Sequence, residues 1–174
     1  MPTVYVMCGI HASGKSTIAK KIAAFDKAVI LSAEEIRREL FRGQKFNSIQ
    51  NEATYRMIWN RYYANLTTGK NIVIDDTNLK RGVRMGFIKL AKKKGYRTVC
   101  VFCRKSYAYA VNANQMRHDK SRTVPTNVIK RDLNILIPPI DTEGWDEIRI
   151  LDGDQYSIEV ERQKPVFVKG EHYE

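Results

Sequence analysis

Short apolar runs alternate along the chain with longer stretches in which apolar residues recur every three or four positions. The apolar runs predict β-strands, and the periodic stretches predict amphipathic helices. The predicted strands cover residues 3–8, 28–31, 71–75, 97–103 and 145–151. The predicted helices cover residues 15–25, 32–43, 48–68, 80–94, 106–117 and 125–136. This alternation is typical of an α/β fold with a mostly parallel central sheet and helices on both of its faces.

The same periodicity predicts which helical side chains face the sheet. Phe25 falls near the apolar face of the first predicted helix, and Gly43 marks the end of the second. In the long helix 48–68, Ala53, Met57 and Ala64 are among the inward candidates.

The pattern G-x-x-x-x-G-K-S directly follows the first strand and opens the first helix. Its glycines allow backbone geometry in which successive N–H groups surround phosphate oxygens, and the helix adds its N-terminal dipole. Lys15 should reach the β- and γ-phosphates, and the Ser16 hydroxyl should bind Mg²⁺, so a nucleoside triphosphate is the expected ligand. The residues predicted to bind it are Gly9, Ala12, Ser13, Gly14, Lys15, Ser16 and Thr17. His11, inside this loop, either takes part in catalysis or fills the loop beside solvent.

Two carboxylates, Asp75 and Asp76, end the third predicted strand. In open α/β sheets, ligands bind at the carboxyl ends of the strands. One acid can orient the waters of Mg²⁺ or the phosphate-loop lysine, and we assign Asp75 to the metal and Asp76 to catalysis. The alternative, a cap for the helix that follows, suits Thr77 or Asn78 better than Asp76.

An acid and an arginine follow the second predicted strand and should lie at the same edge of the sheet. Glu34 and Arg37 are three residues apart, on one helical face. Such a carboxylate can accept the proton of an attacking hydroxyl while the arginine steadies a phosphate. An ordinary helix start rich in ion pairs is the alternative. Because Ser32-x-x-Glu35 forms a capping box, Glu35 has a structural explanation and Glu34 is left free.

A basic polar stretch, residues 117–122, lies between two predicted helices. It can fold over a triphosphate, exclude water and bring an arginine to the γ-phosphate. Arg117 and Arg122 are the candidates, because arginine suits bidentate phosphate contacts. A solvated turn is the alternative.

Composition narrows the possibilities further. At 174 residues the chain should form one domain, with all predicted elements in residues 1–151 and an extension or tail in residues 152–174. Thirty lysines and arginines against 19 acids give a formal charge of +11, which suggests a polyanionic partner, although a generally basic surface would explain it too. Cys100 and Cys103 lie within an apolar run, so we interpret them as core rather than as a redox or zinc motif. With no apolar window of about 20 residues and no leader pattern, we expect no membrane span and a cytoplasmic location.

The order of these segments resembles a known family. It runs G-x-x-x-x-G-K-S-T, then S-x-acid-x-x-R, then D-T-N after a strand, then N-x-x-R followed by V-P. This order resembles the phage-type polynucleotide 5′-kinase, the kinase half of the phage 5′-kinase/3′-phosphatase, over residues 3–151. Asp76-Thr77-Asn78 and the segment from Asn114 to Pro125 are the more specific parts.

The resemblance implies a compact P-loop kinase with a basic lid, which uses ATP and Mg²⁺ to phosphorylate a 5′-hydroxyl of DNA or RNA. By position, it implies that Glu34 is the general base and that Arg37 acts at the phosphates of the site. It also implies that Asp76 is the carboxylate of the D-T-N signature and that Arg117 is the lid arginine on the donor phosphates. With Lys15, these form the predicted catalytic set.

The sequence departs from the family at several points. The base is usually aspartate where Glu34 stands here, and Ala113 precedes Asn114 where an arginine is expected, a loss for which Arg122 could compensate. No D-x-D-G-T phosphatase signature is present, so the chain resembles a kinase without the phosphatase.

Other functions remain open. A related kinase could phosphorylate a hydroxymethylated base in DNA, such as 5-hydroxymethyluracil, or a small metabolite or nucleotide sugar, as zeta-toxin-like kinases do. A non-catalytic or purely hydrolytic nucleotide switch is a different class. The Glu34–Arg37 pair argues against it, because a switch needs no base and arginine aimed at an acceptor.

Overall fold

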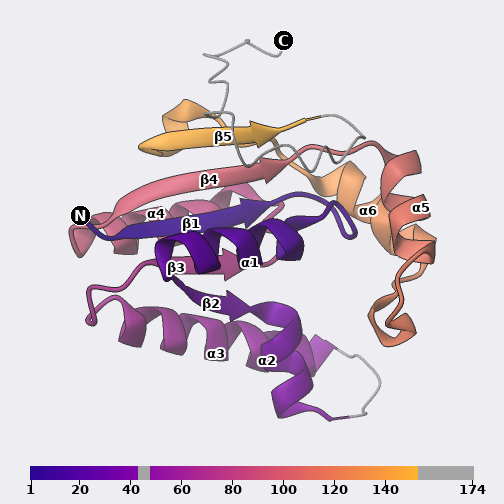
Figure 1. Ribbon diagram of the computed structural model, residues 1–174, viewed down its shortest axis with the longest axis horizontal. Helices are drawn as coiled ribbons and strands as arrows, with labels where there is room; N and C mark the ends of the chain where they lie inside the picture. The colour runs from indigo at the N-terminus through magenta and orange to yellow at the C-terminus, as the bar shows by residue number, and fades with distance from the viewer. Residues whose placement is uncertain (43–47, 153–174) are drawn as a thin grey trace.

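The computed structural model describes residues 1–42 and 48–152, and these residues form a five-stranded parallel sheet with helices on both faces (Figure 1). The strand order is β2-β3-β1-β4-β5. The strands are β1 (Thr3–Cys8), β2 (Val29–Ser32), β3 (Ile72–Asp75), β4 (Arg97–Cys103) and β5 (Glu147–Leu151). The predicted α/β class is therefore confirmed, and the sheet is wholly parallel within the described residues.

Six α-helices and two short 3₁₀ helices connect the strands in the described part of the chain. The α-helices are α1 (Lys15–Asp26), α2 (Ala33–Leu40), α3 (Ser48–Asn65), α4 (Arg81–Lys93), α5 (Tyr107–Gln115) and α6 (Thr126–Ile135). The 3₁₀ helices are η1 (Lys120–Arg122) and η2 (Asp141–Glu143). α5, η1 and α6 gather beyond the carboxyl ends of the strands (Figure 1).

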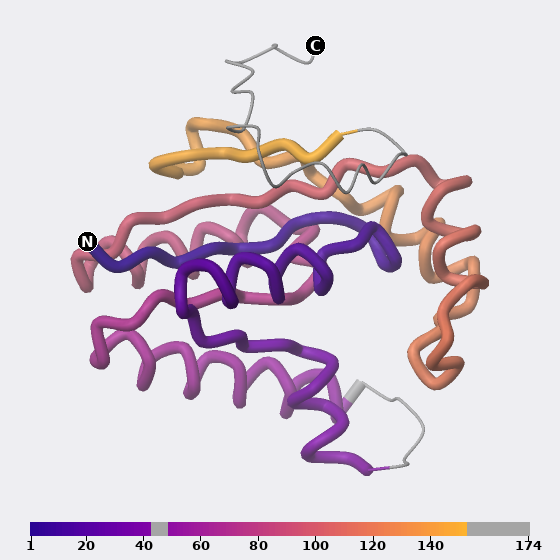
Figure 2. The backbone as a smooth tube through the Cα atoms, viewed as in Figure 1, coloured from indigo at the N-terminus to yellow at the C-terminus, as the bar shows by residue number. Residues whose placement is uncertain are grey.

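Alternation along β1 divides the core into two layers. Val4 and Val6 pack with residues of α3 and α4, whereas Tyr5 and Met7 pack with residues of α1 on the other face. The backbone trace shows α1 in front of the strands and α4 behind them (Figure 2). Because the strands are parallel, their carboxyl ends share one edge, where Ser32 of β2 lies in register with Asp75 of β3.

Two predictions about inward residues are wrong. Phe25 is 88% exposed, because the stripe of α1 that faces the sheet continues instead to Asp26, whose carboxylate accepts a hydrogen bond from the Tyr5 hydroxyl at 2.5 Å. Ala64 is exposed as well. The buried stripe of α3 contains Thr54 and Tyr62, whose hydroxyls are satisfied by carbonyl oxygens of the protein. Hydroxyl-bearing residues thus replace alanine on the inward face.

Other expectations concern the cysteines and the ends of elements. Cys100 and Cys103 are buried in β4 and pack in different clusters, so their interpretation as core is confirmed. α2 ends at Leu40, and the predicted stop at Gly43 lies outside the described residues. Residues 153–174 also lie outside them, so the predicted extension is untested. None of the helices in the described residues is long and apolar enough to cross a membrane.

Candidate nucleotide and acceptor site

The phosphate loop depends on glycine at its first position. Gly9 has a φ of +143°, and a Cβ atom there would lie 2.6 Å from the Cys103 carbonyl oxygen, so a larger residue does not fit. Gly14 is left-handed too, with a φ of 87°, at the start of α1. The Gly9 N–H donates to the Thr77 carbonyl at 3.0 Å, which joins the loop to the D-T-N turn.

Lys15 lies folded against the loop that precedes it. Its side chain is buried, and Nζ donates to the Ile10 carbonyl at 2.6 Å and to Ser13 Oγ at 3.4 Å. Burial lowers the pKa of Lys15, while nearby groups, among them Asp75 and Asp76, oppose the shift. Both hydrogen-bond acceptors of Lys15 Nζ are uncharged, so an anionic phosphate would replace them favourably.

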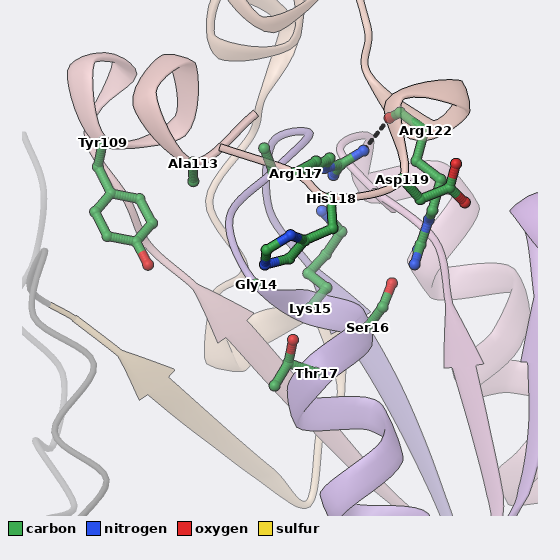
Figure 3. Close-up of a pocket in the computed structure, with 11 residues that line it drawn as sticks. Gly14, Lys15, Ser16, Thr17, Tyr109, Ala113, Arg117, His118, Asp119 and Arg122 are labelled. Carbon is green, nitrogen blue, oxygen red and sulfur yellow. Dashed lines mark hydrogen bonds between the residues drawn. The ribbon is translucent and has the colours of Figure 1, made fainter. Parts of the chain in front are cut away.

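A cavity of about 470 Å³ opens beside this loop, under the segment that was predicted to form a lid. Its lining comes from the phosphate loop, α1, α5 and the segment after α5 (Figure 3). The lining residues are Ala12, Gly14, Lys15, Ser16, Thr17, Tyr109, Ala113, Arg117, His118, Asp119 and Arg122. The predicted loop and the predicted lid arginines thus meet at one cavity large enough for a small-molecule ligand.

The lid is held at its base by the asparagine of the N-x-x-R segment. Asn114 is buried, donates to the Val124 carbonyl at 2.8 Å and accepts from the Val124 N–H at 3.1 Å. Arg117 donates to the carbonyl of Arg122, as Figure 3 shows. Burial and the charge of Arg122 lower the pKa of Arg117. Two cations are therefore held together over the cavity, an arrangement that an anion would stabilise.

Arg122 links the lid to α2. Its Nε donates to Glu34 Oε1 at 2.7 Å, and its Nη2 donates to Glu34 Oε2 at 3.0 Å. Arg38 also donates to Glu34 Oε1, at 3.1 Å. Glu34, which the capping box leaves without a structural role, is therefore ion-paired in the structure, because Arg122, 88 residues away in sequence, supplies a partner that no local pattern reveals. The capping interaction itself is present, since Ser32 Oγ accepts from the Glu35 N–H at 3.4 Å.

Asp75 ends β3, and Ser16 in the first turn of α1 lies within hydrogen-bonding reach of its carboxylate. Burial raises the pKa of Asp75, and a hydrogen bond from Ser16 and the charge of Lys15 partly offset that effect. A carboxylate and a hydroxyl in contact at this position are oxygen ligands of the kind that Mg²⁺ prefers. These two residues therefore fit a magnesium ion.

Asp76 faces a tyrosine that the sequence did not single out. The Tyr55 hydroxyl of α3 donates to Asp76 Oδ2 at 2.6 Å. Burial and then the charge and hydrogen bond of Asp76 raise the pKa of Tyr55, Arg37 opposes them, and Asp132 adds to them. Asp76, Arg37 and Asp132 therefore all lie within electrostatic reach of Tyr55.

Hydrogen bonds of two buried side chains, Asn78 and Arg84, hold the turn that carries Asp76. Asn78 has a φ of 45° and donates to the Met7 carbonyl at 2.7 Å. Arg84 donates to the carbonyls of Asn78 and Leu79 at 3.0 and 3.1 Å and forms a fully buried ion pair with Glu143. The asparagine of the D-T-N triplet thus shapes the backbone, whereas its aspartate faces the site.

The structure separates the predicted site residues into two groups. Of the predicted nucleotide-binding residues, all but Gly9 and Ser13 are among the described residues that line the cavity. Of the predicted catalytic residues, Glu34 reaches the cavity through Arg122, whereas Arg37 and Asp76 lie around Tyr55. Tyr55 and Tyr109 were missed, because an aromatic residue on a helix gives no periodic signal that separates a site from a core. His118 and Asp119 lie within the predicted stretch 117–122, although that prediction named only its arginines.

A protein-family comparison matches residues 4–138, most of the chain, to the family described as AAA domain. A candidate kinase from Chloroflexus aurantiacus is 16% identical, with a TM-score of 0.70 over 87% of this chain and 85% of that one. A gluconokinase from Sinorhizobium meliloti is 19% identical, with a TM-score of 0.62 over 89% of this chain and 85% of that one.

A chain of the Pnkp1/Rnl/Hen1 RNA repair complex is 19% identical, with a TM-score of 0.68. That comparison covers 78% of this chain and 44% of the other. At such identities the likeness establishes the fold alone. The chain belongs to the AAA domain family, and its fold is that of the P-loop kinases.

Proposed function

We propose that this protein is an ATP-dependent polynucleotide kinase that transfers the γ-phosphate to a 5′-hydroxyl of DNA or RNA. The bidentate pair between Arg122 and Glu34 carries the proposal. The pair places a guanidinium that can bind the donor phosphate next to a carboxylate that can accept the proton of the acceptor hydroxyl. The cavity beside the phosphate loop adjoins that pair.

In this proposal Glu34 accepts the proton of the acceptor hydroxyl as its oxygen bonds to the γ-phosphorus. The bond from that phosphorus to the bridging oxygen breaks, and its electron pair remains on the diphosphate product. Lys15, Arg117 and Arg122 stabilise the charge on the transferring group and on the leaving phosphate. Asp76 and Arg37, held around Tyr55, orient the acceptor.

Arg122 has to leave Glu34 before Glu34 can act as a base. A carboxylate that accepts two hydrogen bonds from a guanidinium is stabilised in its charged form and accepts a proton poorly. The γ-phosphate is a stronger anion for the same arginine, so donor binding transfers Arg122 to the phosphate and frees Glu34. The proposal therefore includes an order, in which the donor binds before the acceptor reacts.

Ser16 and Asp75 are the residues that would hold Mg²⁺, because their oxygens already lie together beside the loop. Mg²⁺ bound there would neutralise charge on the β- and γ-phosphates.

A polynucleotide acceptor is supported by the charge of the chain and by the surface beside the cavity. The formal charge is +11. Arg38, which is 56% exposed, donates to Glu34, and it lines a second hollow of about 500 Å³ together with Arg42, Glu35 and Glu39. Exposed arginines near Glu34 could bind the phosphates that follow a 5′-terminal nucleotide. The shared fold with a chain of an RNA repair complex agrees with this substrate class.

A small hydroxyl compound is the second candidate acceptor, favoured by the fold shared with a gluconokinase. A hydroxymethylated base in DNA is a third, since it would use the same basic surface. These candidates require the same donor chemistry and differ only in the acceptor.

The test is transfer of labelled γ-phosphate to a 5′-hydroxyl oligonucleotide. The same oligonucleotide with a 5′-phosphate is the matched control, and gluconate and a 5-hydroxymethyluracil oligonucleotide are the competing acceptors. We expect label on the 5′-hydroxyl strand and a KM for that strand that rises steeply with salt. Label on gluconate alone, or ATP hydrolysis without transfer to any strand, would contradict the proposal.

A further inference from the structure

The two sides of the donor cavity differ in chemistry. Arg122 lies on one side and Tyr109 on the other, with Lys15 of the phosphate loop between them (Figure 3). Tyr109 and Ala113 both line the cavity from α5, and because they are four residues apart they share one face of that helix. One side therefore offers charge, whereas the other offers an aromatic ring and a methyl group.

The charged side suits the phosphates of a nucleotide. Lys15 and Ser16 belong to the phosphate loop, and Arg117 donates to the carbonyl of Arg122 beside the same cavity. With the β- and γ-phosphates at these residues, the ribose and the base extend away from them along the cavity. The lining continues past the loop to Tyr109, so the base has room on that side.

Packing holds the Tyr109 ring in a defined position relative to the phosphate loop. The Tyr109 backbone N–H donates to Ser106 Oγ at 3.1 Å, which caps α5. The next residue, Ala110, is fully buried in one cluster with Ile10 of the phosphate loop, so the helix packs directly against that loop. Lys105 Nζ lies 5.1 Å from the centroid of the Tyr109 ring, a cation–π contact that favours the observed orientation of the ring.

Ala113 keeps space open beside the ring. An arginine is expected at this position from the family that the sequence resembles, and its long cationic side chain would occupy part of the cavity. With alanine there, the cavity measures about 470 Å³, within the usual range for small-molecule sites. This departure from the family falls at the place where the base of the donor would lie.

We propose that Tyr109 is a nucleobase-binding residue, whose ring stacks on the base of the donor nucleotide, and that Ala113 provides the space for that base. Every base has a π-face, so stacking on an aromatic side chain needs no charged partner. The phosphates and the base are thereby held by different elements, the loop with its lid and α5. This inference rests on the proposed use of a nucleoside triphosphate, and it is independent of which acceptor is used.

The test compares ATP with ribose 5′-triphosphate, which carries the same sugar and phosphates but no base. Tyr109→Ala should weaken ATP binding about 5–100-fold, as for loss of one stack between a base and an aromatic ring, and should weaken ADP binding by the same factor. The affinity for ribose 5′-triphosphate should stay within about twofold, because only the base makes the stacking contact. Equilibrium competition against labelled ATP measures all three affinities.

Three further variants keep the test decisive. Tyr109→Phe retains the ring and should bind ATP like the wild type. Tyr107→Ala is the matched control, because Tyr107 belongs to α5, is 37% exposed and is not among the described residues that line the cavity, and it should leave the affinity for ATP unchanged. Ala113→Leu keeps the helix and the ring but fills the space beside it. It should weaken ATP more than ribose 5′-triphosphate, and it serves if Tyr109→Ala does not fold.

Equal weakening of ATP and ribose 5′-triphosphate in Tyr109→Ala would make Tyr109 a support of the phosphate loop and overturn the proposal. Unchanged ATP affinity in that variant would place the base elsewhere and also overturn it, whichever acceptor the wild type labels. A wild type that binds ATP through Tyr109 but labels no oligonucleotide would overturn the polynucleotide acceptor and leave the stacking role standing, so the two failures are distinguishable.

Discussion

Two arginine–glutamate ion pairs of this protein have the same chemistry and opposite surroundings. The side chains of Arg84 and Glu143 are both 0% exposed. Those of Arg122 and Glu34 are 32% and 37% exposed, next to the nucleotide cavity. The buried pair has further fixed partners, since Arg84 donates to two carbonyls and Trp145 donates to Glu143. The open pair, Arg122 and Glu34, is partly exposed to solvent and borders the cavity through Arg122.

The difference shows how one pair of residue types serves two purposes. Breaking the buried pair leaves an uncompensated charge in the core, so that pair is permanent and holds the D-T-N turn in place. Breaking the open pair costs little, because water or a phosphate replaces either partner. The open pair can therefore be exchanged during a reaction cycle, which suits a base and a lid.

The largest expected effect comes from the open pair and is kinetic. Glu34→Gln should lower the rate of phosphoryl transfer about 10²–10⁴-fold, the range for loss of a general base. Its free energy of unfolding should change by less than about 1 kcal/mol, because the pair is exposed. Both are measured on one preparation, by labelled transfer and by urea denaturation.

Glu35→Gln is the matched control, since Glu35 is the neighbouring acid and its backbone N–H, not its carboxylate, binds Ser32 Oγ. Its transfer rate should stay within about twofold, well short of the effect of losing a base. Unchanged transfer in Glu34→Gln, with ATP still bound, would favour a nucleotide switch over a kinase.

The next effect comes from the buried pair and is thermodynamic. Glu143→Gln should lower the free energy of unfolding by about 3–5 kcal/mol, because Arg84 is left charged and buried. The double variant Arg84→Met/Glu143→Leu should recover much of that loss, because neither charge remains. Urea denaturation measures the free energy of unfolding of both variants. If Glu143→Gln lowered it by less than about 1 kcal/mol, the buried pair would not differ from the exposed pair of Glu34 in its contribution to stability.

The smallest expected effect concerns the pair of His11 and Asp132. The exposure of this pair is intermediate between those of the two arginine–glutamate pairs, because Asp132 is buried and His11 is partly exposed. The folded-state pKa of Asp132 is lowered, so its contribution to stability is present above the unfolded pKa of about 3.9 and is lost as the pH falls through the folded pKa. Asp132→Asn should therefore differ most from the wild type near neutral pH. The two unfolding free energies should converge as the pH falls below 4 in urea titrations, and a constant difference would contradict this reading.

Local patterns predicted most of the fold. Strand positions, the phosphate loop and the parallel sheet follow from apolar runs and from glycines with defined backbone geometry. The predicted faces of α1 and α3 failed at Phe25 and Ala64. A hydropathy pattern ranks residues by type, whereas the packed helix is positioned by the sheet beneath it, and a tyrosine or threonine with a satisfied hydroxyl can occupy the core.

The structure brings the predicted site residues near the loop to one cavity, and it adds neighbours that the sequence did not indicate. Lys15 and Ser16 could be placed because their roles follow from positions within one continuous motif. Tyr55 could not, because its only link to the site is a contact with Asp76, 21 residues later. The pairing of Glu34 with Arg122 could not be predicted either, because it depends on the position that residues 117–122 take in the folded chain.

By itself, the sequence determined that a phosphate loop follows the first strand and that acids end the second and third strand–turn segments. Backbone geometry and side-chain periodicity act over a few residues, so a sequence displays them directly. Only the tertiary structure decided which charges meet. It placed one arginine–glutamate pair under the turn and another across the cavity, and it set His11 against Asp132, 121 residues away. Those choices depend on burial and on contacts between distant segments, and the chain acquires both only when it folds.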